Sequence, residues 1–352
     1  MAEKKNMNGE KTRAGRKGLT DEKLTAGEKA AADEKAAAGE IDFSNAKYRG
    51  RLRQIPIYIG KLFRMFVYQN DWKVIPLAVF IAALVALVVK RTFFVTMEGT
   101  TKGALALTSV SLWNGFFNSI QVVCRERNIV KREHRSGLHM SSYIAAHMVY
   151  QAFLCIIQTI TTVLVFRYSG VQFPKHHLVN GFTLDFILTI FLITYAADML
   201  SLFISSVARS TTAAMTVMPL VLMVQLIFSG CMFSLPGSMK GLSKFMISNH
   251  GTACICAEAD YNGLKSTSGW SMLNKMAGRP DADPNVKSMV EDMERNGYKE
   301  VVEAETAKSN YKEDYVYTAA NVKHRWRVLA GFALFFALLS VVSLEFIDKD
   351  RR

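Results

Sequence analysis

The sequence lacks the motifs that mark the common nucleotide-binding and hydrolytic enzymes. The phosphate-binding pattern G-x-x-x-x-G-K-[ST] is absent, because Gly60-Lys61 has no upstream glycine at the required spacing and is followed by Leu62. Without this loop no backbone N–H groups are placed to hold phosphates, which excludes an ATPase of this type within the chain. No H-E-x-x-H, Ser-His-Asp or paired-carboxylate site stands out either. We therefore expect no catalytic residues and no cofactor.

Cysteine is scarce, and its placement predicts no metal site. Of the five cysteines, Cys124 and Cys155 lie in or beside apolar segments and are expected to be small core residues. Cys254 and Cys256 are too close for an easy mutual disulfide, whereas a bridge from Cys231 is an open alternative. Metal binding by the C-x-C pair is less favoured, because no Cys or His cluster completes four ligands.

A nucleic-acid-binding surface is also missing. The net charge is +13, but the basic residues are not interleaved with aromatic residues as such a surface requires. In a membrane protein, a basic excess instead marks cytoplasmic loops beside anionic lipid. Membrane lipid, and not nucleic acid, is therefore the expected partner.

Long hydrophobic runs are abundant. Half of the 352 residues are hydrophobic, and they are bunched into runs whose length suits a bilayer better than a soluble core. We predict an all-α polytopic membrane protein with six membrane-spanning helices. The predicted spans cover about 74–89, 103–123, 144–166, 182–207, 212–233 and 328–346, and Pro219 interrupts the fifth.

The polar segments suggest how the domain is arranged. Residues 1–54 form a polar low-complexity tail, 55–346 the membrane domain, and 347–352 a short second tail. Within the membrane domain, 55–70 mixes apolar and basic residues as an amphipathic interfacial helix does, although a simple extension of the first span is the alternative. A long polar segment at about 234–323 precedes the last span, and surface helices are expected at 289–317.

Charge in the loops predicts the orientation. The 125–142 loop carries the strongest basic cluster and should be cytoplasmic, which places both termini inside and the 234–323 loop outside. Lys323, Arg325 and Arg327 disagree, since they would lie just outside the last span. Long external segments translocate despite their charge, so the larger cluster decides.

Polar side chains within the spans are candidates for lining a cavity. Asn114, Asn118 and Gln121 make the second span unusually polar, and Asp198 lies in the middle of the fourth. A lone charge there costs about 2.5–3.5 kcal/mol, so Asp198 must face a partner, water or a cavity. It is either a substrate or proton contact or, as we favour, a structural hydrogen-bond partner for a neighbouring helix. His147 is expected to lie at the interface.

One charged stretch separates the second and third spans. Residues 125–137 read RERNIVKREHRSG, which is too charged to lie in the bilayer. The spacing of Glu126-Arg127, Arg132-Glu133 and Gly137 resembles that of type-2 ABC transporter permeases, especially the G-subfamily and pleiotropic-drug-resistance type. In that family the stretch is the cytoplasmic coupling element that touches the ATPase. The resemblance therefore assigns these five residues to coupling.

The resemblance extends over about residues 55–346 and departs from the family in places. Val130 and His139 stand where the family has Phe and Tyr, and Gln151 stands where many relatives are acidic. The segment from Phe228 to His250 is similar to one that leads into short re-entrant helices, although His250 replaces a Pro.

The resemblance implies half of a plasma-membrane exporter for an apolar or amphipathic substrate. A second permease half, identical or different, would complete the transporter. Its ATPase would be a separate chain or a domain removed ahead of the tail. Two other functions stay open: a lipid-modifying membrane enzyme using Asp198 and His147, and a scaffold or channel subunit not linked to ATP.

Overall fold

The computed structural model describes residues 50–68, 74–175, 178–231, 237–279 and 283–346. The predicted tails, except for 50–54, lie outside these residues. The described part is built from α-helices, and its only β-type pairing is an isolated bridge between Thr96 and Lys265. The all-α prediction is therefore confirmed for this part.

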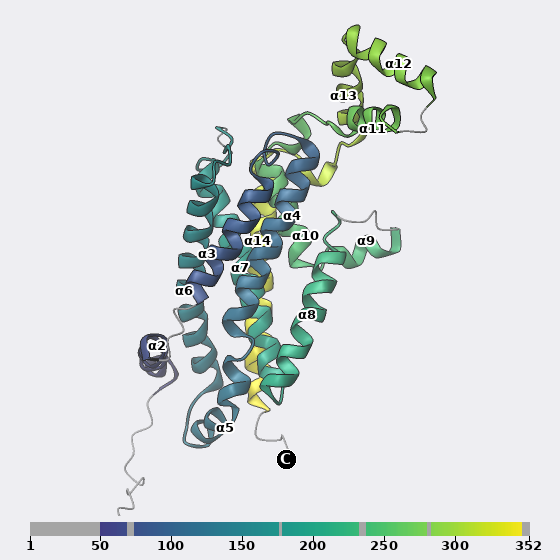
Figure 1. The fold of residues 1–352 in the computed structure, drawn as a ribbon. Coiled ribbons are helices and arrows are strands. Elements are labelled where there is room, and N and C mark those ends of the chain that lie inside the picture. Colours follow the sequence, from purple (N-terminus) through teal and green to yellow (C-terminus); the bar gives the residue numbers. More distant parts are fainter. Residues whose placement is uncertain (1–49, 69–73, 176–177, 232–236, 280–282, 347–352) are drawn as a thin grey trace, which may run out of the picture. The chain divides into compact units, whose positions relative to one another are not determined.

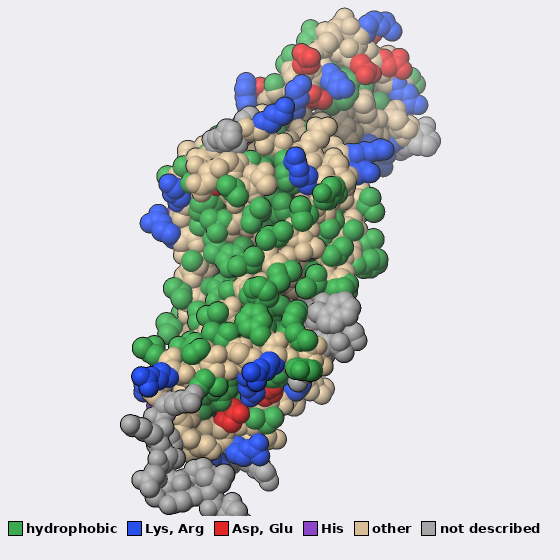
Figure 2. Space-filling model, turned by 90° about the vertical axis from the view of Figure 1, so that its left-hand side faces the viewer, with side chains coloured by type: hydrophobic (Ala, Val, Ile, Leu, Met, Phe, Trp, Pro, Cys, Tyr) green, Lys and Arg blue, Asp and Glu red, His purple; other side chains and the backbone are tan. Residues whose placement is uncertain are grey.

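A helix lies at each of the six predicted span positions. These are α3 (Val74–Val89), α4 (Met97–Ser119), α6 (Met140–Tyr168), α7 (Phe182–Val207), α8 (Thr211–Ile227) and α14 (Ala319–Glu345), which form one bundle (Figure 1). By length and composition, α6, α7 and α14 are sufficient to cross a membrane, whereas α3 and α8 are shorter apolar helices. Figure 2 shows a band of hydrophobic side chains between two charged ends, as a bilayer requires.

Helix α7 lies at the centre of the bundle and packs extensively against both α4 and α14. The contact with α4 is close because Gly115 has no side chain. A Cβ at this position would collide with the carbonyl oxygen of Thr194 and lie 2.8 Å from the Cβ of Ala197. Small residues at such a contact let two backbones approach, which is how membrane helices gain packing energy.

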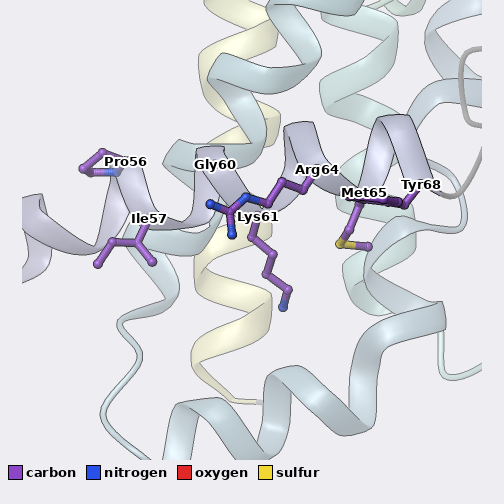
Figure 3. A pocket seen from close by; sticks show the side chains of 7 residues that line it. All are labelled: Pro56, Ile57, Gly60, Lys61, Arg64, Met65 and Tyr68. Carbon is purple, nitrogen blue, oxygen red and sulfur yellow. The ribbon is translucent and has the colours of Figure 1, made fainter.

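The amphipathic segment forms its own helix, α2 (Arg51–Tyr68), and not an extension of α3. It crosses the direction of the bundle helices (Figure 3). Its buried Leu62 packs against Ala146, Tyr150 and Leu154 of α6. The ring of Phe63 adds an edge-on contact with Tyr150 at 5.6 Å. The prediction of a separate helix is therefore confirmed.

The second span is shorter at its end than predicted. We expected it to continue to Val123, but α4 stops at Ser119 and a new helix, α5 (Val122–Arg135), starts after a two-residue corner. Val123 is fully buried, although it no longer belongs to the span. Its hydrophobicity therefore reflects packing at the corner, and this misled a prediction based on apolar run length.

The fifth span also differs from its prediction. Helix α8 runs through Pro219 without interruption and ends at Ile227, before the predicted Phe233. Pro219 has no backbone N–H, so one hydrogen bond is missing, but the helix continues on both sides.

The segment between α8 and α14 is mostly helical. It contains α9 (Gly237–Ser243), α10 (Ile247–Glu258), α11 (Ser268–Ala277), α12 (Pro284–Arg295) and α13 (Tyr298–Ser309). Helix α10 is buried along its length and packs against α4, α7, α8 and α14, as a re-entrant helix would. Helices α11 to α13 lie at the end of the bundle opposite α5 (Figure 1). The last helix already begins at Ala319, so residues 319–323 do not belong to the preceding loop.

Candidate functional site

The charged stretch 125–137 forms most of helix α5, and the start of this helix is held by α7. The hydroxyl oxygen of Ser205 accepts hydrogen bonds from the backbone N–H groups of Val123 at 3.1 Å and Cys124 at 3.2 Å. The first turn of a helix has N–H groups without intrahelical partners. Ser205 satisfies two of them from another helix and so fixes where α5 starts.

Arg127 makes a second connection between α5 and α7. Its Nη1 donates hydrogen bonds to the carbonyl oxygens of Ser206 at 2.9 Å and Ala208 at 3.1 Å. These carbonyls lie at the C-terminus of α7, where the helix dipole is negative and carbonyl groups lack intrahelical partners. Arg127 of α5 therefore caps the end of α7, just as Ser205 of α7 caps the start of α5.

The other end of α5 is held by α2. The Glu133 carboxylate accepts a hydrogen bond from the Tyr58 hydroxyl at 2.7 Å and one from Lys61 Nζ at 3.3 Å. Burial raises the pKa of Tyr58, and the bond to Glu133 raises it further, so this hydroxyl stays protonated and donates. Gln54 of α2 donates to the Gly137 carbonyl and accepts from the His139 N–H, both at 3.0 Å.

Gly137 ends α5 in a left-handed conformation. Its φ is +100°, a region that penalises a side chain. The N–H of Leu138 donates to the Glu133 carbonyl at 3.0 Å, and that of Gly137 donates to the His134 carbonyl at 3.0 Å. This pair of bonds is the Schellman motif, which explains why a glycine stands at this position.

The remaining face of α5 is exposed. Its residues recur at the three- and four-residue spacing of one helix face, and they are mostly basic or polar. They are Arg125, Asn128, Ile129, Arg132, Arg135 and Ser136. Of the five predicted coupling residues, only Arg132 lies on this exposed α5 face. Arg127 and Glu133 are half-buried and attach α5 to α7 and α2, and Glu126 is also half-buried.

Asp198 lies at the middle of α7, fully buried, and joins three helices. The Ser119 hydroxyl donates to its Oδ1, while Asn118 Nδ2 at 3.4 Å and the Cys155 thiol at 3.3 Å donate to its Oδ2. Asn118 also exchanges two hydrogen bonds with Gln158 of α6, at 3.0 and 2.9 Å. This arrangement agrees with the structural interpretation of Asp198, because the carboxylate fixes the end of α4 just before the corner.

The four predicted cavity-lining residues are only partly brought together. Asn118 and Gln121 line one recess of about 210 Å³, together with Arg125 and other residues of α4, α5 and α6. Asp198 reaches this recess only through its hydrogen bond with Asn118. Asn114 is buried and does not line it.

The comparison with known families agrees with this geometry. The model of the ABC-2 type transporter family matches residues 61–248, more than half of the chain. The chain belongs to the ABC-2 type transporter family. The match includes α5, the corner and the Asp198 cluster. No curated protein matches the sequence. The chain is thus an integral membrane permease subunit of an ABC transporter, and so a transport subunit and not an enzyme.

The alternative of a membrane enzyme rests on His147 and Asp198, which both lie in the described part of the permease. His147 is fully buried on α6, and both of its ring nitrogens lack a hydrogen-bond partner. Its ring centroid lies 4.5 Å from that of Tyr143, and the unpartnered ring nitrogens show that it is not hydrogen-bonded to Asp198. The five cysteines are free thiols, and the described residues contain no cluster of metal-binding side chains.

The sequence did not point to several residues that position α5 in the permease. Ser205, Gln54 and Tyr58 contact α5 across about 80 positions of the chain. No local pattern distinguishes such a serine or glutamine from others in an apolar helix. The amphipathic character of α2 was the only available signal, and it indicated the helix without its contacts.

Proposed function

We propose that this permease is the membrane half of an ATP-driven exporter of the G-subfamily or pleiotropic-drug-resistance type, with α5 as its coupling helix. The observation that carries the proposal is the attachment of α5. A charged helix at one end of the bundle is joined to α7 by Ser205 and Arg127 and to α2 by Glu133. An unattached surface loop could not transmit a displacement to the bundle, whereas this helix can.

The exposed α5 face is the proposed docking surface for the ATPase. It presents Arg125, Arg132 and Arg135 around Ile129, whose side chain is 42% exposed. An apolar residue ringed by basic residues suits a partner groove with an apolar floor and an acidic rim, because opposite charges steer and orient the contact. The ATPase is expected as a separate chain or domain, since no phosphate-binding loop occurs in this sequence.

Movement of the docked ATPase would reach the substrate path through the corner. The end of α4 is tied to α7 by Ser119 and Asp198, and the start of α5 is tied to α7 by Ser205. A displacement of α5 should therefore shift α4 and α7 together. Nucleotide binding would then favour one of two bundle arrangements through the differential contacts that the ATPase makes with α5.

A second permease half would complete the transport path. Only a narrow stripe of α8 is buried, formed by Ala214, Met218, Leu222 and Gln225. The remaining apolar surface of α8 is available to lipid or to another half. The recess lined by Asn118 and Gln121 combines polar and aromatic groups, which suits an apolar or amphipathic substrate. We further propose that the transporter resides in the plasma membrane. In the proposed orientation, α5 and both termini face the cytoplasm, and α11 to α13 lie outside the cell.

Co-purification tests this function. Tagged permease is extracted from its native membranes, the associated chains are identified, and their ATPase activity is measured with and without the permease. We expect an ABC ATPase to be recovered, and Arg132→Glu on the exposed α5 face to release it. The control is Arg295→Glu, a charge reversal at an exposed residue of α12 at the opposite end, where Arg295 makes only an exposed ion pair with Asp292 of its own helix. Recovery of no ATPase, or equal loss with both variants, would contradict the proposal.

A further inference from the structure

We propose that a recess on the outer side of α2 binds the headgroup of an anionic glycerophospholipid from the leaflet on the α5 side. The recess has a volume of about 550 Å³ and opens over Gly60, between Ile57, Lys61 and Arg64 (Figure 3). It lies opposite the face of α2 that packs against α6 through Leu62. It is therefore a surface that the bundle itself leaves open.

Gly60 gives the recess its space. A Cβ placed on Gly60 would meet no atom within 4 Å, so no neighbouring side chain fills this position. The Arg64 side chain lies over the gap, while Lys61 extends toward α5 (Figure 3). The guanidinium of Arg64 and the stem of Lys61 thus border one hollow, and a guanidinium offers several donors to a phosphate group.

The charge of α2 favours an anion. The helix has four basic side chains and no acidic one, namely Arg51, Arg53, Lys61 and Arg64. Lys61 forms an ion pair with Glu133 at 3.3 Å. Across the residues that the structure describes, the Arg64 guanidinium has neither an ion pair nor a hydrogen bond. The Arg64 guanidinium beside the hollow can therefore bind an anionic ligand without breaking an existing contact.

The apolar surroundings identify the anion as a lipid. Ile57 is 47% exposed, Val67 66% and Tyr68 84%, so large hydrophobic side chains flank the basic groups. An amphipathic helix lying across the bundle direction places such side chains against acyl chains and its basic groups among headgroups. A free phosphate ion would use the basic groups and leave this apolar surface in water, whereas a phospholipid satisfies both.

Native mass spectrometry of the purified full chain tests the site without an ATPase, so its outcome is independent of the proposed function. Phosphatidylglycerol and phosphatidylcholine with the same acyl chains are titrated separately. We expect preferential binding of phosphatidylglycerol, weakened about fivefold by Arg64→Gln, as for one basic group at an anionic surface. Gly60→Leu should weaken it at least as much by filling the hollow with the charge unchanged. Arg53→Gln, a matched charge loss on α2 outside the recess, should change it less than about twofold.

Three results would overturn the proposal. Equal losses with Arg53→Gln and Arg64→Gln, together with unchanged binding in Gly60→Leu, would mean a diffuse surface potential. Displacement of the lipid by millimolar glycerol 3-phosphate would mean a site for soluble phosphate. Equal binding of the two lipids would show that the site does not recognise the negative charge of the headgroup. Thermal unfolding of Gly60→Leu serves as the folding control, and its midpoint should not fall because leucine favours a helix more than glycine does.

Discussion

The bond between Tyr58 and Glu133 should contribute more to the attachment of α5 than the ion pair between Lys61 and Glu133. The Tyr58 hydroxyl lies 2.7 Å from the carboxylate, and a hydrogen bond to a charged group contributes about 1.5–3 kcal/mol. Lys61 lies 3.3 Å away, and the side chains of the pair are 36% and 31% exposed. Solvent screens such a pair, which contributes about 0–1 kcal/mol.

A double-mutant cycle separates the two contributions. Tyr58→Phe removes only the hydroxyl and keeps the ring contact with Tyr143 at 5.9 Å. Combined with Glu133→Gln, it should give a coupling energy of about 1.5–3 kcal/mol in reversible unfolding of the purified chain. The matched cycle of Lys61→Gln with Glu133→Gln should give less than about 1 kcal/mol.

Variants that break the contact between Tyr58 and Glu133 should lose coupling while remaining folded. When the contact with α2 is lost, α5 is held only by α7, and we expect substrate-stimulated ATPase activity of the assembled transporter to fall in Tyr58→Phe and in Glu133→Ala. The Tyr58 result distinguishes attachment from docking, because Tyr58 lies on α2 and not on the exposed α5 face. A Tyr58–Glu133 coupling energy below about 0.5 kcal/mol, with parental transport in both variants, would refute this reasoning.

Four further predictions concern the two ends of α5, the orientation of the protein in the membrane and its lack of ATPase activity. Gly137→Ala should lower the unfolding free energy by about 1–2 kcal/mol, because its φ of +100° penalises a Cβ; stability equal to the parent would count against the Schellman turn. Ser205→Ala should cost about 1–2 kcal/mol by leaving the Val123 and Cys124 N–H groups unpaired, and Ser205→Thr should restore part of it. Ser136→Cys should resist an impermeant thiol reagent applied to intact cells and react after permeabilisation; labelling from outside would reverse the orientation. The purified chain alone should neither bind nor hydrolyse ATP, and hydrolysis by a preparation free of ATPases would contradict this.

The regular features of the fold could be read from the sequence because they depend on local composition. The apolar runs are longer than a soluble core requires, and they predicted a helix at each of six positions. The mixture of basic and apolar residues at 55–70 indicated α2. The ends were less predictable. Val123 reads as the end of a span but is buried at a corner, and Pro219 reads as a break but lies within a continuous helix.

The candidate site was located by sequence but interpreted only through structure. The spacing of Glu126, Arg127, Arg132, Glu133 and Gly137 selected the segment that forms most of α5. It did not separate Arg132 on the exposed α5 face from Arg127 and Glu133, which attach the helix to α7 and α2. Such a division depends on which side of α5 faces its neighbours, and this is fixed by residues about 80 positions away.

By itself, the sequence determined the class of protein, because the hydrophobic effect and the cost of charge in lipid act on every segment according to its own composition. It also located the charged stretch between two apolar helices and the acidic residue Asp198 within an apolar span. Only the tertiary structure decided what these groups touch. Hydrogen bonds between distant helices, such as those of Asp198 with Ser119 and of Ser205 with Val123, depend on packing that brings their elements together, and no local pattern records that packing.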